Sequence, residues 1–117
     1  MSDQSITSSA EFSRSLAVER RKNALREMSF VELSALPAIA REPLSSPAGV
    51  GRLGICRRDL PDGALLLMLR CEWPEPDPFV QYTGFVKRSD DSYSERRPEI
   101  FDEHIRAQVD QSLRAAA

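Results

Sequence analysis

The sequence predicts one α+β domain with N-terminal helices, a three-stranded antiparallel β-meander and an amphipathic C-terminal helix packed on the sheet. Two observations carry this prediction. The helical signals lie at the two ends of the chain, and the strand signals lie between them. Helices and strands segregated in this way are typical of the α+β class, whereas regular alternation would favour α/β. We expect residues 1–117 to form a single domain.

Composition supports a folded chain and argues against some function classes. The 117 residues are 41% hydrophobic and carry 16 Lys+Arg against 18 Asp+Glu, a formal net charge of -2. This apolar content is ordinary and the net charge is small, so intrinsic disorder is not expected. A chain of this length can bury enough surface to fold without a metal or a disulfide. The small net charge gives no long-range field that would attract nucleic acid or an anionic membrane.

The N-terminus and the apolar runs predict a cytoplasmic protein. The first nine residues contain neither a basic stretch nor an apolar run, so we expect no secretory leader. The longest uninterrupted apolar run, 64–69, is far shorter than the roughly 20 residues that a helix needs to span a bilayer. Fourteen of the 16 basic residues are arginine, in an alanine-rich chain. We interpret this bias as the trace of a GC-rich bacterial genome.

The N-terminal third reads as helical. Residues 1–7 are polar, and we expect them to be disordered. Ser8 and Glu11 have the spacing of a capping box, in which each side chain bonds the other residue's backbone N–H. The first helix is therefore predicted to start at Ser8 and to run to about Met28.

A second helix and a connector follow. Ser29 and Glu32 repeat the capping-box spacing in front of an apolar run, and Pro37 should end the helix. The helical segment is thus expected to cover 8–40. Prolines, serines and glycine between 41 and 49 predict a connector without regular structure.

The middle of the chain carries the strand signals. We predict antiparallel strands within 50–88, at 50–58, 64–73 and 79–88. Between the first two, Leu60-Pro61-Asp62-Gly63 is a turn in which proline presets the second position and glycine tolerates a positive φ. Prolines end the second strand, because proline cannot donate a hydrogen bond to a neighbouring strand.

The C-terminal segment 98–115 predicts an amphipathic helix. Pro98 suits the first turn, where the N–H that proline lacks would be unpaired anyway. Asp110 and Arg114 lie one turn apart, a spacing that predicts an ion pair on the polar side. The apolar side repeats every four residues, at Phe101, Ile105, Val109 and Leu113.

The turn also predicts a register for the two cysteines. With residues 61–62 at the tip, Cys56 faces Leu67. In the same register Cys71 faces Arg52. The cysteines then share a face about 13 Å apart along the strands, too far for a disulfide, and a slip of one residue would put them on opposite faces. We expect buried free thiols. Two thiols and one histidine cannot complete a four-ligand zinc site, and we predict no metal and no cofactor.

The second strand is apolar on both faces, and this observation carries the preferred function. A half-exposed antiparallel strand alternates apolar and polar residues, so each face of this strand should be covered, by helices of the same chain or by a partner. In the predicted register one face carries Cys56, Leu65, Leu67, Leu69, Cys71 and Trp73, and the other carries Leu53, Ile55, Leu66 and Met68.

We therefore predict a small non-enzymatic protein-interaction module, homodimeric, that binds a protein partner through an apolar sheet face or a sheet edge. Tryptophan and tyrosine are enriched at the energetic centres of interfaces. The argument for a partner fails if one chain covers both faces of strand 64–73. The predicted interface residues are Leu65, Leu67, Leu69 and Trp73, with Tyr82 as an anchor at the rim.

The first alternative is a nucleic-acid-binding regulator. Aromatic rings on the third strand, at Phe79, Tyr82 and Phe85, could stack on bases of a single strand. Acidic residues interspersed along the same strands weigh against a clustered basic surface. The basic residues proposed for this role are Arg52, Arg57, Arg58, Arg70, Lys87 and Arg88.

The second alternative is a small enzyme or ligand-binding domain with a pocket between the sheet and the last helix. Its polar lining would come from His104, Tyr82 and Cys71. The neighbouring acids Glu99, Asp102 and Glu103 could bind a divalent ion, but nearby arginines already compensate them. No serine lies in a nucleophile motif and no glycine-rich loop precedes a helix, so we predict no catalytic residue.

Overall fold

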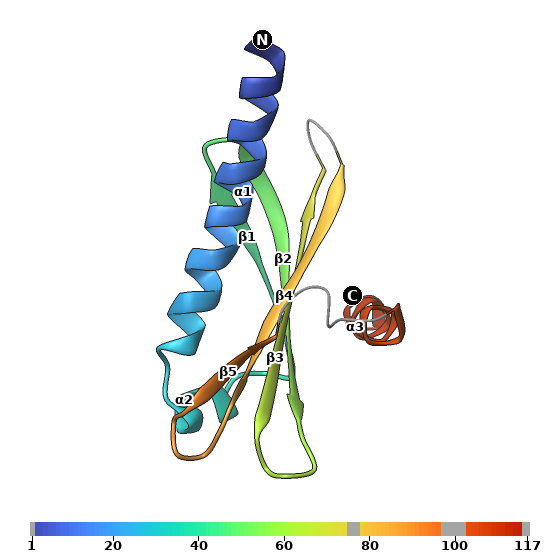
Figure 1. The fold of residues 1–117 in the computed structure, drawn as a ribbon. Helices are drawn as coiled ribbons and strands as arrows, with labels where there is room; N and C mark the ends of the chain where they lie inside the picture. The colour runs from blue at the N-terminus through green and yellow to red at the C-terminus, as the bar shows by residue number, and fades with distance from the viewer. Residues whose placement is uncertain (1, 75–77, 97–102, 116–117) are drawn as a thin grey trace.

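The computed structural model describes residues 2–74, 78–96 and 103–115, and the side chains of 10–74, 78–95 and 106–114. Within these ranges one antiparallel sheet has five strands in sequential order, flanked by helices (Figure 1). The α+β class with helices at both ends is confirmed. The elements are α1 (Ser2–Arg26), α2 (Phe30–Ser34), β1 (Ile39–Ser46), β2 (Gly49–Asp59), β3 (Leu65–Trp73), β4 (Phe79–Lys87), β5 (Tyr93–Arg96) and α3 (Glu103–Ala115).

The sheet has five strands where the sequence predicted three. The predicted connector 41–49 belongs to the hairpin of β1 and β2, which pair from Ile39 with Cys56 to Ser46 with Gly49. Proline is tolerated here because β1 is an edge strand, where a missing N–H need not break the ladder. The serine and glycine signals mark a tight turn. The Ser46 hydroxyl accepts from the Ala48 N–H at 3.1 Å, and Gly49 takes a φ of 129°.

The fifth strand follows the polar turn after β4. Asp91 has a positive φ of 71° in this turn, and the Asp90 carboxylate accepts from the Ser92 N–H at 2.9 Å. The chain then returns as β5, which pairs with 84–87 of β4. Its four residues are too few to show a strand pattern in the sequence alone.

The start of α1 differs from the prediction, whereas the start of α2 agrees with it. α1 begins at Ser2, ahead of the predicted start at Ser8. Serine and threonine are tolerated inside helices, so a capping-box spacing alone does not fix a helix start. The second capping box is confirmed: the Ser29 hydroxyl accepts from the Glu32 N–H at 3.1 Å, and the Glu32 carboxylate accepts from the Ser29 N–H at 3.0 Å.

The register of the β2–β3 hairpin is one residue away from the prediction. Asp59 pairs with Leu65, and a five-residue loop closes through a hydrogen bond from the Leu60 N–H to the Ala64 carbonyl. Cys56 therefore faces Met68, and Cys71 faces Leu53. Both cysteines are free and buried as expected, but on opposite faces of the sheet. Leu53 and Ile55 move to the face of Trp73, and Cys56 moves away from it.

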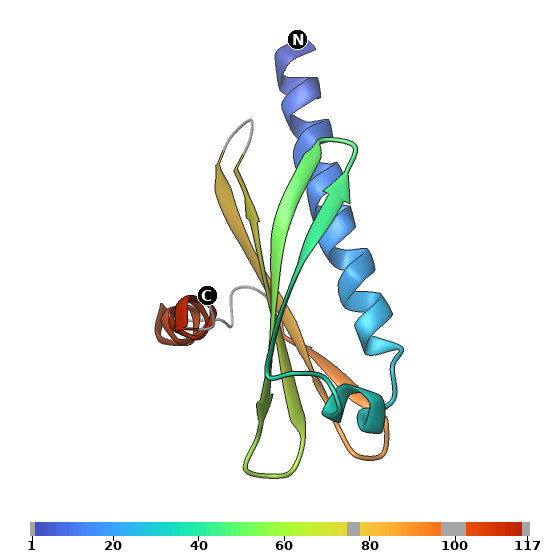
Figure 2. The ribbon, with the colours of Figure 1, turned by 180° about the vertical axis from the view of Figure 1, so that it is seen from behind.

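Helices of the same chain cover both faces of β3. α1 runs along one face, and α3 lies across the other (Figures 1 and 2). The core beneath α1 and α2 contains Val18, Leu25, Leu33, Leu53, Ile55, Leu65, Leu67, Leu69, Cys71, Trp73 and Phe85. The core beneath α3 contains Cys56, Leu66, Met68, Val109 and Leu113.

This coverage removes the observation on which the predicted interface depended. Leu65, Leu67, Leu69 and Trp73 are at most 2% exposed, because α1 and α2 pack over them. In this structure they are core residues of the chain itself.

The C-terminal helix packs on the sheet as predicted, from Glu103 onward. Val109 and Leu113 are buried against the sheet. Residues 98–102, including Phe101, and the side chain of Ile105 lie outside the described parts of the structure. None of the helices in the described ranges is long and apolar enough to cross a membrane.

Candidate functional site

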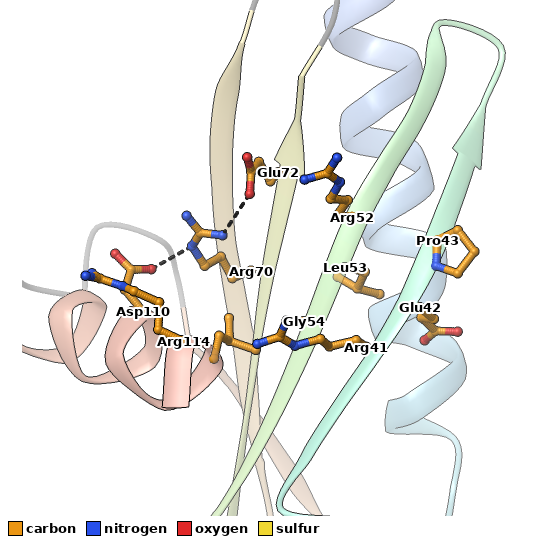
Figure 3. Close-up of a pocket in the computed structure, with 11 residues that line it drawn as sticks. Arg41, Glu42, Pro43, Arg52, Leu53, Gly54, Arg70, Glu72, Asp110 and Arg114 are labelled. Carbon is orange, nitrogen blue, oxygen red and sulfur yellow. Dashed lines mark hydrogen bonds and ion pairs between the residues drawn. The ribbon is translucent and has the colours of Figure 1, made fainter. Parts of the chain in front are cut away.

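A groove lies beside α3, on the face of the sheet opposite to α1. It has a volume of about 660 Å³ and is formed by β1, β2, β3 and α3 (Figure 3). Its lining residues are Arg41, Glu42, Pro43, Arg52, Leu53, Gly54, Arg70, Glu72, Asp110, Leu113 and Arg114. Four of these are arginines, brought together from four separate elements.

Gly54 sets how closely α3 approaches the sheet. A Cβ atom built on Gly54 would lie 2.6 Å from Cδ2 of Leu113, inside the contact distance of two carbon atoms. The absence of a side chain therefore lets Leu113 rest directly on the β2 backbone. This contact seats the helix at the lower end of the groove.

Arg70 joins the sheet to α3 at the centre of the groove. Its Nε lies 2.6 Å from Oδ1 of Asp110, and its Nη1 lies 3.4 Å from Oε2 of Glu72 (Figure 3). The Tyr82 hydroxyl donates to the same Asp110 carboxylate at 2.9 Å. Burial raises the pKa of Tyr82, so the hydroxyl keeps the proton that it donates. Asp110 is thus held by two groups of the sheet.

Three other arginines of the groove have no anionic partner. Among the described residues, no hydrogen bond or ion pair involves Arg41, Arg52 or Arg114, and all three are exposed. The predicted ion pair between Asp110 and Arg114 does not form, because Asp110 pairs with Arg70. Arg41 extends from β1 across Gly54 (Figure 3).

The acids of the groove are already engaged. Glu42 pairs with Arg21 of α1 at 2.7 Å, and Glu72 and Asp110 share Arg70. The unpaired charge in the groove is therefore positive. Guanidinium groups bind carboxylates and phosphates through paired N–H donors. The guanidinium groups make the groove suited to holding an anion; among the described residues that line it there is no serine, threonine, cysteine or histidine.

The residues predicted for nucleic-acid binding do not form one surface. Arg52, Arg58 and Arg70 share the face of the groove, where Arg58 donates to Gln108 of α3 at 2.6 Å. Arg57 and Lys87 point to the opposite face. The remaining one, Arg88, lies in the exposed turn after β4.

The two residues on the opposite face have structural partners. The Arg57 guanidinium donates to the Ser34 carbonyl at 2.8 Å, and the Lys87 ammonium donates to the Arg26 carbonyl at 2.9 Å. Both contacts satisfy carbonyl oxygens near helix C-termini, where positive charge is favourable. Of the predicted stacking rings, Phe85 is completely buried on this same face.

The predicted polar pocket lining is also dispersed. A groove does lie between the sheet and the last helix, but Cys71 lies on the other face, and burial raises the pKa of Cys71 to about 12. The structure does not describe the side chains of His104, Glu99, Asp102 and Glu103. Tyr82 faces α3, with the Arg106 guanidinium 5.1 Å from its ring centre.

Sequence reasoning missed Arg41 and Arg114. Arg41 fell in the predicted connector, and Arg114 was assigned to an ion pair with Asp110. The sequence of β1, Ile-Ala-Arg-Glu-Pro-Leu-Ser-Ser, does not alternate apolar and polar residues, so it does not show the pattern of a strand. The groove becomes visible only when β1, β2, β3 and α3 are placed side by side.

No group of three or more histidine, cysteine, aspartate or glutamate residues within the described part could hold a metal ion. Comparisons with protein-family models, with curated proteins and with solved structures gave no match.

Proposed function

We propose that this protein is a small non-enzymatic protein-interaction module whose groove beside α3 holds an acidic segment of a partner protein. The observation that carries the proposal is the set of three exposed, unpaired arginines, Arg41, Arg52 and Arg114, around the paired Arg70. A carboxylate-rich segment would supply anionic partners for these three arginines.

The surroundings of the groove favour a peptide over a nucleic acid. Pro43 lines the groove, and Val50 and Val80 are exposed by 58% and 37% on the same face of the sheet. These side chains offer apolar contacts on the face that carries the groove. A segment that carries both acidic and apolar residues matches both features.

A polyphosphate backbone matches the groove less well. A phosphate backbone carries a charge at every nucleotide and offers no apolar side chain that would contact Pro43. The Tyr82 ring, which could stack on a base, is half-buried beside Arg106. Nucleic-acid binding is therefore the competing outcome of the test.

Fluorescence anisotropy tests the proposal directly. The probe is a labelled peptide that alternates glutamate and leucine, with a lysine–leucine peptide and a single-stranded DNA of equal charge as comparisons. We expect the acidic peptide to bind in preference to both, with an affinity that falls as salt is added. Failure to bind the acidic peptide, or tighter binding of the DNA, would overturn the proposal.

Matched variants locate the binding site. Each exposed charge pair contributes about 0.2–1 kcal/mol, so combining Arg41→Ala, Arg52→Ala and Arg114→Ala should weaken binding several-fold and flatten its salt dependence. Arg20→Ala is the control, because it removes an exposed arginine from α1 on the opposite face. Equal weakening by both changes would show a nonspecific charge effect and would exclude the groove as the site.

A further inference from the structure

The outer edge of β4 is only partly covered. β5 pairs with residues 84–87 of β4, whereas the described residues provide no partner strand for 79–83 on that side. Within the described parts of the chain, the backbone N–H and C=O groups of this five-residue edge can therefore pair with another strand.

This edge lacks the features that usually protect an edge strand. Natural edges are commonly blunted by charged side chains or by proline. The opposite edge of the sheet, β1, carries both, in Arg41, Glu42 and Pro43. Residues 79–83, with the sequence Phe-Val-Gln-Tyr-Thr, contain no charge and no proline.

Exposed apolar side chains flank the same edge on both faces. Val80 is 37% exposed on the face of the groove. On the other face, Gln81 donates to the Ser15 hydroxyl at 2.9 Å, which places α1 over β4 at this point. Phe12, one turn before Ser15, is 68% exposed, and the adjacent Leu16 is 36% exposed. A strand added here would meet apolar groups on both faces.

We propose that residues 79–83 pair antiparallel with the same segment of a second copy, across a twofold axis at Gln81, so that two sheets join into one. In this arrangement Val80 lies opposite Tyr82 of the second copy, and no like charges face each other. The axis is perpendicular to the sheet, so both α1 helices lie on one face of the junction. That brings Phe12 and Leu16 of both copies to the junction, a contact that a lone peptide strand would not provide.

The size of the junction predicts weak association. Five residues of strand are about 17 Å long. Contacts this small are typical of weak, reversible complexes. Dimer formation should therefore depend on protein concentration within the micromolar to millimolar range.

Analytical ultracentrifugation over that range tests the proposal with paired variants. Val80→Lys places a charge on the edge and should keep the protein monomeric. Val50→Lys is the control, because Val50 is exposed on the same face but belongs to β2, away from the β4 edge. Val80→Thr keeps a β-branched residue without a charge and should still dimerise. Circular dichroism checks that each variant is folded.

The outcomes separate this proposal from the proposed function. A wild-type protein that stays monomeric throughout, a mass above that of a dimer, or dimerisation of Val80→Lys equal to that of Val50→Lys would overturn the edge interface. Hydrogen exchange should show added protection of residues 79–83 at high concentration in the wild type and in Val50→Lys, but not in Val80→Lys. Acidic-peptide binding is measured on the wild type at concentrations where it is monomeric, so loss of the dimer and loss of the groove are read independently.

Discussion

The guanidinium of Arg70 on β3 lies 2.6 Å from the carboxylate of Asp110 on α3, and this ion pair links the sheet to the last helix. This ion pair also determines which charged side chains of the groove remain unpaired. Because Arg70 occupies Asp110, Arg114 one turn further along α3 has no ion-pair partner among the described side chains. One contact thus both fixes the helix and leaves a cation exposed beside it.

Asp110→Asn should change stability and binding in opposite directions. The amide loses the charge that pairs with Arg70, and its oxygen can still accept from Tyr82. We expect a loss of about 1–2 kcal/mol in the free energy of unfolding, at the low end for bonds to charged groups because both side chains are partly exposed. The freed Arg70 should bind the acidic peptide a few-fold more tightly. Urea denaturation and anisotropy measure the two effects.

A double-mutant cycle with Arg70→Met assigns these effects to the pair. If the Arg70–Asp110 contact carries them, the two losses of stability are not additive. Additive losses, or weaker peptide binding by Asp110→Asn, would contradict the role given to this contact.

Alanine at Gly51 should cost more stability than alanine at Gly54. A Cβ on Gly51 would lie 2.8 Å from Cε3 of Trp73, a rigid ring that is completely buried. At Gly54 the obstacle is the flexible end of Leu113, on a helix at the surface. Overpacking of a core costs about 1–3 kcal/mol, and we expect Gly51→Ala at the upper end and Gly54→Ala at the lower.

Thermal unfolding ranks these two variants, and hydrogen exchange locates the change. Gly54→Ala should increase hydrogen exchange in α3 and leave β3 protected, since the change disturbs only the contact between α3 and the sheet. Adding Leu113→Ala to Gly54→Ala should cost less than Leu113→Ala does alone in the wild type, because the new methyl group fills the vacated space. A larger cost for Gly54→Ala than for Gly51→Ala would refute the ranking.

These contacts also show where sequence reasoning succeeded. The capping box at Ser29 and Glu32 and the apolar spacing of Val109 and Leu113 are local signals, and the structure contains both. Each depends on residues within a turn or two of one another. Short-range physics therefore predicted the class of fold and the helices at its ends.

The remaining features depend on pairing between distant segments. β1 contains Pro43 and two serines, and it is a strand because β2 lies beside it. The hairpin register shifted by one residue because the turn closes at Leu60 and Ala64. A shift of one residue exchanges the two faces of a strand relative to its neighbour. The groove could not be predicted without β1 and the observed hairpin register. Arg41 lies on β1, which the sequence did not predict, and its neighbours in the groove share one face of the sheet only in the observed register.

Cys71 should make the fold sensitive to alkali. Burial raises its pKa from 9.0 to about 12, so the folded state favours the neutral thiol. The stabilisation is complete below the unfolded pKa of 9.0 and is lost as pH rises from there toward 12. The free energy of unfolding should fall by up to about 1.4 kcal/mol per pH unit in this range.

Urea denaturation from neutral pH to pH 11, on the wild type and Cys71→Ala, measures this effect. The variant should be less stable at pH 7, because it leaves a cavity, yet lose less stability as pH rises. Cys56 remains as an internal reference, since burial raises its pKa too. Identical pH slopes for the two proteins would rule out Cys71 as the titrating group.

Arg14 should be a main attachment of α1 to the sheet. It is 2% exposed, and its guanidinium lies 5.8 Å from the ring centre of Trp73 and 5.2 Å from that of Phe79. A desolvated cation over aromatic rings contributes about 2 kcal/mol, and truncation adds a packing loss, so Arg14→Ala should cost roughly 3–4 kcal/mol. Trp73 is the only tryptophan of the chain, so its fluorescence reports the local environment.

The comparison that separates charge from packing is Arg14→Met against Arg14→Ala. Methionine keeps most of the apolar stem but removes the cation, so it should recover the packing part of the loss and leave the cation–π part. Recovery of full stability would mean that the charge of Arg14 contributes nothing. If Arg14→Ala instead matched the wild type, the contact with Trp73 and Phe79 would be incidental to the fold, and α1 would be held by its other contacts, among them the burial of Val18 and Leu25.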